Sequence, residues 1–180
     1  MGRARQDLRI QTRRLFLEPV TAAHANALHE AVVSSRTELL PWMPWAVDPT
    51  PEGSLRQAAQ SEADWQTGTR YHFVSIHRES LAVLGVVGIN DEHLQMPELH
   101  YWIRSDHAGQ GLTTAAAGAV IGWAATALGI RRTIWLWAGR ENAASRRVAE
   151  KLGFTHVGPL EWRPAGGLGD FDAERYELKL

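Results

Sequence analysis

The stretch that most constrains the fold is residues 101–130, YWIRSDHAGQGLTTAAAGAVIGWAATALGI. Its aromatic start predicts a strand that ends near Arg104, and residues 113–128 carry apolar side chains at helical spacing. Gly109 and Gly111 stand between the two elements. Such a junction directs free backbone N–H groups out of the helix N-terminus, where they can bind an anion. Glycines also serve an ordinary turn, so both interpretations stay open on this stretch alone.

Strand-like and helix-like segments alternate along the rest of the chain without a linker. The patterns predict strands at 13–20, 71–78, 81–89, 98–105, 132–139, 155–162 and 174–180, and helices at 22–35, 48–68, 113–128 and 142–154. The second and third strands are expected to form an antiparallel hairpin. Residues 39–49 hold three prolines and predict an irregular loop. We therefore expect one α/β domain over residues 1–180, with a mixed α+β sheet.

Composition excludes several classes of function. The formal net charge is -1, which predicts neither a nucleic-acid nor an anionic membrane partner. The absence of cysteine fits a reducing compartment, and no stretch approaches the length of an apolar membrane span, so we expect a soluble cytoplasmic protein. The eight histidines lack ligand spacing, as with His24 and His29 five residues apart on a predicted helix, and no metal site is predicted.

Two nucleotide-binding patterns fail at the glycine junction. No Gly-Lys-Ser/Thr follows the glycines, which removes the Walker loop. The dinucleotide fingerprint requires a third glycine where Thr114 stands.

The hexapeptide 106–111, DHAGQG, resembles motif A of the GCN5-related N-acetyltransferases (GNAT), in which Gln or Arg, two free positions, Gly, a free position and Gly or Ala cradle the acetyl-CoA pyrophosphate. Asp106 departs from the usual Gln or Arg, a departure common in the RimJ/RimL-type branch that modifies ribosomal-protein N-termini. RENAASRRVAEKLGF, with Asn142 and Ser145, resembles motif B of that branch. Two motifs in register are far more specific than one.

The resemblance implies a fold and a cofactor. The expected GNAT fold has a central, mostly antiparallel sheet of about seven strands, splayed between strands 4 and 5, and about four helices. The YWI run is similar to the fourth strand of the family, whose bulge opens that splay. The implied acetyl-CoA contacts are Ile103, Arg104, His107, Ala108, Gly109, Gln110, Gly111, Leu112, Thr113, Asn142 and Ser145.

The resemblance also implies direct acyl transfer to an amine in a ternary complex. Ser145 then serves as general acid for the thiolate, Asn142 as clamp for the pantetheine, and the main-chain N–H near Ile103 as oxyanion donor. Each position has a plainer interpretation, because Asn142 also suits a helix N-cap and Ser145 a first-turn serine.

The base and the acceptor wall each have more than one interpretation. Glu161, Glu98 and His100 are candidates for the base, with a water chain as the alternative, and His100 is also a candidate acceptor contact. Trp42 and Trp45 lie in the proline-rich segment that walls the acceptor site in the resembled family. They either form an apolar wall for the acceptor or fill space at the helix ends.

Several functions stay open at this point. The leading expectation is acetyl transfer from acetyl-CoA to a peptide or protein N-terminal amine. A small-molecule amine, such as an antibiotic or polyamine, is the nearest variant, and succinyl-CoA is an alternative donor. A non-catalytic acyl-CoA-binding module is the alternative from another class. The resemblance further implies a possible homodimer.

Overall fold

The computed structural model describes residues 8–90, 97–160 and 172–180. Within these ranges the strands are β1 (Ile10–Gln11), β2 (Leu15–Pro19), β3 (Arg70–His77), β4 (Val83–Asn90), β5 (Glu98–Ile103), β6 (Ile134–Gly139), β7 (Thr155–Pro159) and β8 (Ala173–Leu178). They form one sheet in the order β1-β2-β3-β4-β5-β6-β8-β7, in which only β5 and β6 are parallel neighbours. The α/β class and the predicted hairpin are confirmed.

The helices of the described residues are α2 (Ala25–Ser34), α3 (Arg36–Leu39), α4 (Pro51–Thr67), α5 (Leu112–Ala127) and α6 (Ala143–Lys151), with 3-10 turns η1 (Ala22–His24), η2 (Pro44–Ala46) and η3 (Ser105–His107). The four predicted helices are present as α2, α4, α5 and α6. The irregular segment predicted at 39–49 is mostly turns, as expected, and contains only the last residue of α3 and the short 3-10 turn η2. None of the described helices has the length and apolar character to cross a membrane.

Helix ends form where capping residues occur. The Thr50 hydroxyl accepts a hydrogen bond from the Gly53 N–H at 3.0 Å, and Pro51 occupies the first position of α4. Gly68 ends that helix at a φ of 76°, a conformation that favours glycine. Local sequence signals therefore fix both ends of this helix.

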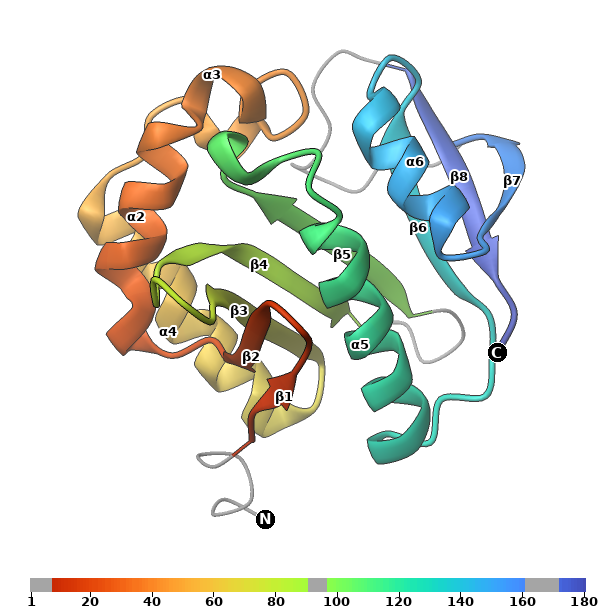
Figure 1. Cartoon of the computed structure of the whole chain (residues 1–180), viewed down its shortest axis with the longest axis horizontal. Helices are drawn as coiled ribbons and strands as arrows, with labels where there is room; N and C mark the ends of the chain where they lie inside the picture. Colours follow the sequence, from red (N-terminus) through yellow and green to blue (C-terminus); the bar gives the residue numbers. More distant parts are fainter. Residues whose placement is uncertain (1–7, 91–96, 161–171) are drawn as a thin grey trace.

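Helices cover both faces of the sheet (Figure 1). Phe73 packs with α5 residues such as Val120 in the larger core cluster, whereas its neighbour Val74 packs with Leu28 of α2 and Ala58 of α4. This alternation follows from the two-residue period of β3. The sheet thus separates α5 from α2 and α4.

The sheet opens between its two parallel strands. β5 and β6 pair at Glu98 and Trp135, and the Trp135 N–H donates to the Pro97 carbonyl at 3.0 Å. Beyond this point the strands diverge, as Figure 1 shows. β5 and β6 are the fourth and fifth of the predicted strands, so the predicted splay is confirmed.

The expected bulge lies one strand away from its predicted position. Pairing between β4 and β5 continues without a register shift as far as Gly85 and Ile103. The irregularity instead falls between β3 and β4, where Ser75 pairs with Gly85 and Ile76 with Val83, so Leu84 is the extra residue. A β-carbon on Gly85 would lie 2.2 Å from the Trp102 carbonyl oxygen, which explains the glycine there.

Candidate active site

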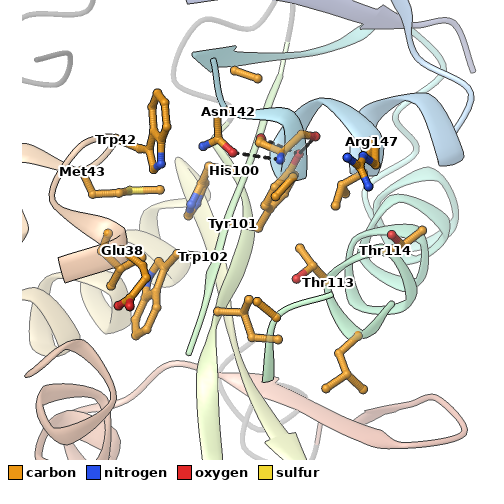
Figure 2. Close-up of a pocket in the computed structure, with 18 of the residues that line it drawn as sticks. Glu38, Trp42, Met43, His100, Tyr101, Trp102, Thr113, Thr114, Asn142 and Arg147 are labelled. Atoms are coloured by element: carbon orange, nitrogen blue, oxygen red, sulfur yellow. Dashed lines mark hydrogen bonds between the residues drawn. The ribbon is translucent and has the colours of Figure 1, made fainter. Parts of the chain in front are cut away.

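A cavity of about 520 Å³ opens where β5 and β6 separate. Its walls come from these strands, α3 and the turn after it, the η3–α5 loop, the first turn of α5, and α6. Figure 2 shows side chains from these elements directed into the same space. The two motifs that are distant in sequence therefore meet at one site.

Alternate side chains of β5 divide this cavity into two halves. Trp102 packs edge-on against Trp45 at 5.9 Å between ring centroids, toward α3, and the Tyr101 hydroxyl lies 3.1 Å from Ser145 Oγ on α6. We call the first the α3 half, formed by Glu38, Trp42, Met43, His100 and Trp102, and the second the α6 half, formed by Tyr101, Thr113, Thr114, Asn142, Ser145 and Arg147 (Figure 2).

The glycine junction lines the α6 half. Gly109 and Gly111 both have φ of 75°, which explains why glycine is required. A β-carbon on Gly109 would meet nothing within 4 Å, and one on Gly111 would meet only the Arg14 guanidinium, at 4.0 Å. Open space therefore faces the main chain at the N-terminus of α5, where the first-turn N–H groups have no acceptor within the helix. These features fit a phosphate group.

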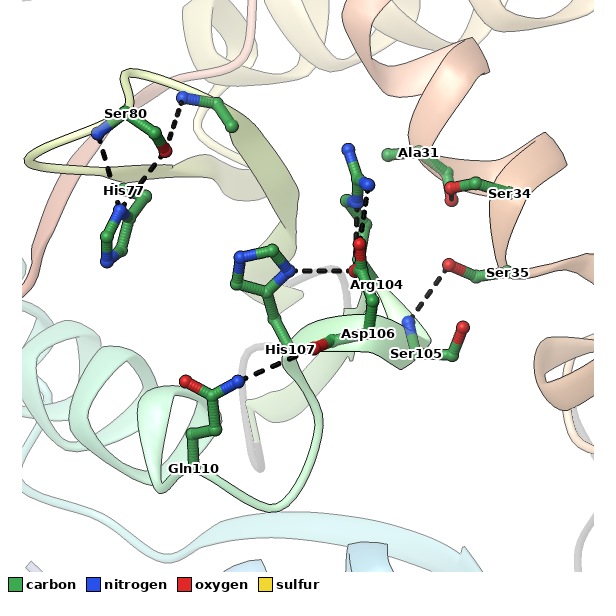
Figure 3. A network of polar contacts seen from close by, with 11 residues as sticks. Ala31, Ser34, Ser35, His77, Ser80, Arg104, Ser105, Asp106, His107 and Gln110 are labelled. Atoms are coloured by element: carbon green, nitrogen blue, oxygen red, sulfur yellow. Dashed lines mark hydrogen bonds and ion pairs between the residues drawn. The ribbon is translucent and has the colours of Figure 1, made fainter.

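Asp106 organises the loop that precedes this junction (Figure 3). Its carboxylate accepts hydrogen bonds from Arg104 Nη2 at 2.7 Å and Nε at 3.1 Å, and lies 2.7 Å from His107 Nδ1. These contacts, with Arg104 first, lower the pKa of Asp106 to about 2. Asp106, which replaces the usual Gln or Arg of motif A, therefore holds Arg104 and His107 together within the loop.

A second contact ties the same loop to the helices on the other face. The Ser105 N–H donates to Ser35 Oγ at 3.0 Å, and Ser35, at the junction of α2 and α3, is only 1% exposed. The loop beside the α6 half is thereby attached to the helical segment that walls the α3 half (Figure 3).

Most predicted cofactor contacts lie at the cavity. Its lining includes Ile103, His107, Ala108, Gly109, Gly111, Leu112, Thr113, Asn142 and Ser145. Arg104 and Gln110 do not belong to the lining. The Arg104 side chain is engaged by Asp106, and the Gln110 carbonyl accepts a hydrogen bond from the Arg14 guanidinium.

Two polar residues of motif B meet Tyr101 of β5 in the α6 half. Asn142 Oδ1 accepts a hydrogen bond from the Ser145 N–H at 3.0 Å, so Asn142 caps α6 while it lines the cavity. The Tyr101 hydroxyl lies 3.1 Å from both the carbonyl oxygen and the hydroxyl of Ser145. Burial raises the pKa of Tyr101 to about 12, so this phenol remains protonated.

The α3 half has an apolar wall and a carboxylate. Trp42 and Met43 line it beside Trp102, whereas Trp45 is 38% exposed and packs against Trp102 outside the cavity lining. Glu38 of α3 also lines this half, and Figure 2 shows it next to Trp102. An aromatic wall beside a carboxylate suits an organic cation.

The candidates for the base differ in their surroundings. His100 lines the cavity and packs edge-on against His72 at 4.5 Å between ring centroids. Burial, followed by the charges of His72 and Arg70, holds the pKa of His100 well below its ordinary value. Glu98 lines the cavity too and accepts a hydrogen bond from Trp137 Nε1 at 3.0 Å. Glu161 lies outside the described residues.

Sequence reasoning did not select several residues that line the cavity. The sequence indicates Tyr101 only as part of a strand, although the two-residue period of β5 separates its face from that of His100. Arg147 and Lys151, four residues apart on α6, also line the cavity, and their spacing was a usable signal. Within the described ranges, no three His, Asp or Glu side chains gather as metal ligands.

Residues 14–155 match the family model described as an acetyltransferase (GNAT) domain. Bacillus subtilis YdaF, provisionally named a ribosomal N-acetyltransferase, is 26% identical over 151 residues, which span 79% of this chain and 77% of YdaF.

Two solved structures share the fold at low sequence identity. A complex of the ribosomal L7/L12 α-N-protein acetyltransferase RimL with coenzyme A has a TM-score of 0.84 and 21% identity, over 96% of this chain and 98% of RimL. The microcin C7 self-immunity acetyltransferase MccE, in complex with acetyl-CoA and AMP, has a TM-score of 0.83 and 19% identity, over 94% of each chain. At these identities the similarity establishes the fold alone.

The splayed sheet and the family match define an acyl-CoA-dependent N-acetyltransferase. Because the family model covers most of its length, the chain belongs to the GNAT acetyltransferase family. Its reaction is therefore the transfer of an acetyl group to an amine.

Proposed function

We propose that residues 1–180 act as one domain that transfers the acetyl group of acetyl-CoA to the N-terminal amine of a peptide or protein. The observation that carries the proposal is the divided cavity, with a glycine-lined anion site in one half and an aromatic, acidic wall in the other. The naming of YdaF and RimL supports a protein N-terminus as acceptor.

The α6 half fits acetyl-CoA. Open space at Gly109 and Gly111 admits phosphate oxygens to the main chain, and Arg147 and Lys151 supply positive charge nearby. Asn142 also lines the cavity and can hold amide groups of the pantetheine. When bound, acetyl-CoA supplies a thioester carbonyl for attack and a thiolate that leaves.

The backbone of β5 supports an oxyanion donor at Ile103. The Arg104 N–H donates to the Leu84 carbonyl of β4 at 2.7 Å, so the adjacent Ile103 N–H points to the opposite edge of the strand. That edge faces the splay, where no β6 partner pairs with it. A donor fixed in this way is preorganised for negative charge that develops on the carbonyl oxygen.

Ser145 and the α3 half supply the remaining roles. Ser145 lines the cavity and donates a proton to the departing thiolate. In the α3 half Trp42 and Met43 contact the acceptor, and Glu38 attracts its ammonium group. Glu98 of β5 accepts the proton that the ammonium must lose before attack, and His100, whose lowered pKa makes it a weak base, contacts the acceptor.

The test is thiol release from acetyl-CoA with a peptide library in which each sequence is present with a free and with a blocked N-terminus. Spermidine, an aminoglycoside and succinyl-CoA are run in parallel. Turnover that requires a free peptide N-terminus and acetyl-CoA supports the proposal. Faster turnover of the small amines than of any peptide contradicts the proposed acceptor, and preference for succinyl-CoA contradicts the donor.

A further inference from the structure

Tyr101 is a buried phenol that points from β5 to Ser145, the acid of the proposed reaction. Its hydroxyl lies 3.1 Å from Ser145 Oγ and 3.1 Å from the Ser145 carbonyl oxygen. Figure 2 shows the Tyr101 side chain directed from β5 toward α6. Its ring packs against the core on the α5 side, and both Tyr101 and Ser145 line the cavity. The side chain is therefore held in place and still borders the reacting space.

We propose that Tyr101 is a positioning residue that aims the Ser145 hydroxyl at the leaving thiolate and returns a proton to it. The proposal rests on the proposed function, because it needs a thiolate that departs in the α6 half. Tyr101 belongs neither to the glycine motif nor to motif B, so the proposal adds a residue to the site that the two motifs do not indicate.

The hydrogen-bond arithmetic of the pair supports this role. A phenol has one proton, so at any moment Tyr101 donates either to the Ser145 carbonyl oxygen or to Ser145 Oγ. When it donates to Oγ, the serine proton has to turn away from the phenol and is free to be donated to a group in the cavity, which Ser145 lines. The Ser145 main chain is fixed meanwhile by the bond from its N–H to Asn142 Oδ1.

The proton balance explains why a serine benefits from this neighbour. As the C–N bond forms and the C–S bond breaks, the Ser145 proton moves to sulfur and the Tyr101 proton moves to Ser145 Oγ. The pair then carries its negative charge as a phenolate, a weaker base than the alkoxide that an isolated serine would become. The proton lost by the amine returns to the phenolate through solvent, so no other reactant is needed. The raised pKa of Tyr101, about 12, keeps the phenol protonated before each turnover.

A purely structural role for Tyr101 predicts a different pattern of kinetic effects. The experiment compares wild type, Tyr101→Phe, Ser145→Ala and the double variant in thiol release from acetyl-CoA with the best peptide acceptor or with water. Tyr71→Phe is the matched control, because it removes one hydroxyl from a strand tyrosine that packs against Trp65 and Trp123. Thermal melts with acetyl-CoA test cofactor binding separately from turnover.

We expect Tyr101→Phe to lower kcat roughly tenfold or more with little change in the KM for acetyl-CoA. In the Ser145→Ala background the same change should have almost no further effect, because the two residues act as one unit. The proposal would be overturned if the loss of kcat in the double variant equalled the product of the losses in the two single variants. It would also be overturned if Tyr101→Phe had the same kcat as Tyr71→Phe. If the wild-type protein does not bind acetyl-CoA in the thermal melts, the proposed function itself is overturned.

A second variant covers the case in which Tyr101→Phe fails to fold. Site-specific 3-fluorotyrosine at position 101 keeps the ring and the hydroxyl and lowers the pKa of the phenol. Because the fluorinated phenolate is a weaker base, kcat at neutral pH should rise while the KM for acetyl-CoA stays the same. An unchanged kcat in a folded protein contradicts proton transfer through Tyr101.

Discussion

The burial of His100 predicts a specific pH dependence of stability. Burial, then the charges of His72 and Arg70, lowers its pKa well below the ordinary value of 6.5. Below pH 6.5 the unfolded chain binds a proton at this position that the native protein does not bind. Native stability therefore falls as the pH is lowered through that window and is fully present above it.

The magnitude follows from linkage. While His100 stays neutral in the native state, it contributes a slope that approaches about 1.4 kcal/mol of unfolding free energy per pH unit. The assay is urea denaturation of wild type and His100→Gln at several pH values from 8 to 5. Above pH 7 the two curves of free energy against pH should run parallel, and below pH 6.5 the wild type should lose stability more steeply. Parallel curves throughout would refute the argument from burial.

Three further predictions concern the cavity and its loop. Trp42→Ala should raise the acceptor KM roughly tenfold, about 1.4 kcal/mol, and leave the KM for acetyl-CoA nearly unchanged in steady-state kinetics; equal rises would remove Trp42 from the acceptor wall. Arg147→Ala with Lys151→Ala should weaken the binding of acetyl-CoA severalfold in calorimetry, because both cations line the cavity that holds the phosphate groups, and an unchanged Kd would show that they do not contact the cofactor. Ser35→Ala should cost about 1–3 kcal/mol in urea denaturation, because it leaves the Ser105 N–H without its acceptor; a loss no larger than that of an exposed serine would contradict this account.

Most of the fold could be predicted because its signals are local. Thr50 and Pro51 mark a helix start, and the apolar period of α5 marks its buried face. The elements that were missed have no such signal. β1 contains two residues and α3 four, too few for any period to emerge. The bulge was expected in β5 and lies in β4. A resemblance to a family indicates that a bulge exists, but it does not fix which residue pairs contain it.

The sequence predicts which segments form the site, but it does not predict which side chains contact one another there. Motif spacing located Gly109, Gly111 and Asn142, which lie together at the cavity. The role of Asp106 depends on two neighbours that fold back onto it, and sequence alone cannot supply that geometry. The contact of Tyr101 with Ser145 depends on how β5 lies beside α6, which the sequence does not show.

The most direct test of the central claim measures acetyl-CoA binding by thermal melts of wild type, Gly109→Leu and Gly129→Leu. Both glycines have positive φ and open space at the β-carbon, but only Gly109 lines the cavity, so the two variants share backbone strain and differ at the site. Acetyl-CoA at about 100 times Kd should add roughly 2.7 kcal/mol, a shift of roughly 5–10 °C for this chain length. The account predicts that shift in wild type and Gly129→Leu and its loss in Gly109→Leu. No shift in the wild type, or an equal shift in all three proteins, would contradict it.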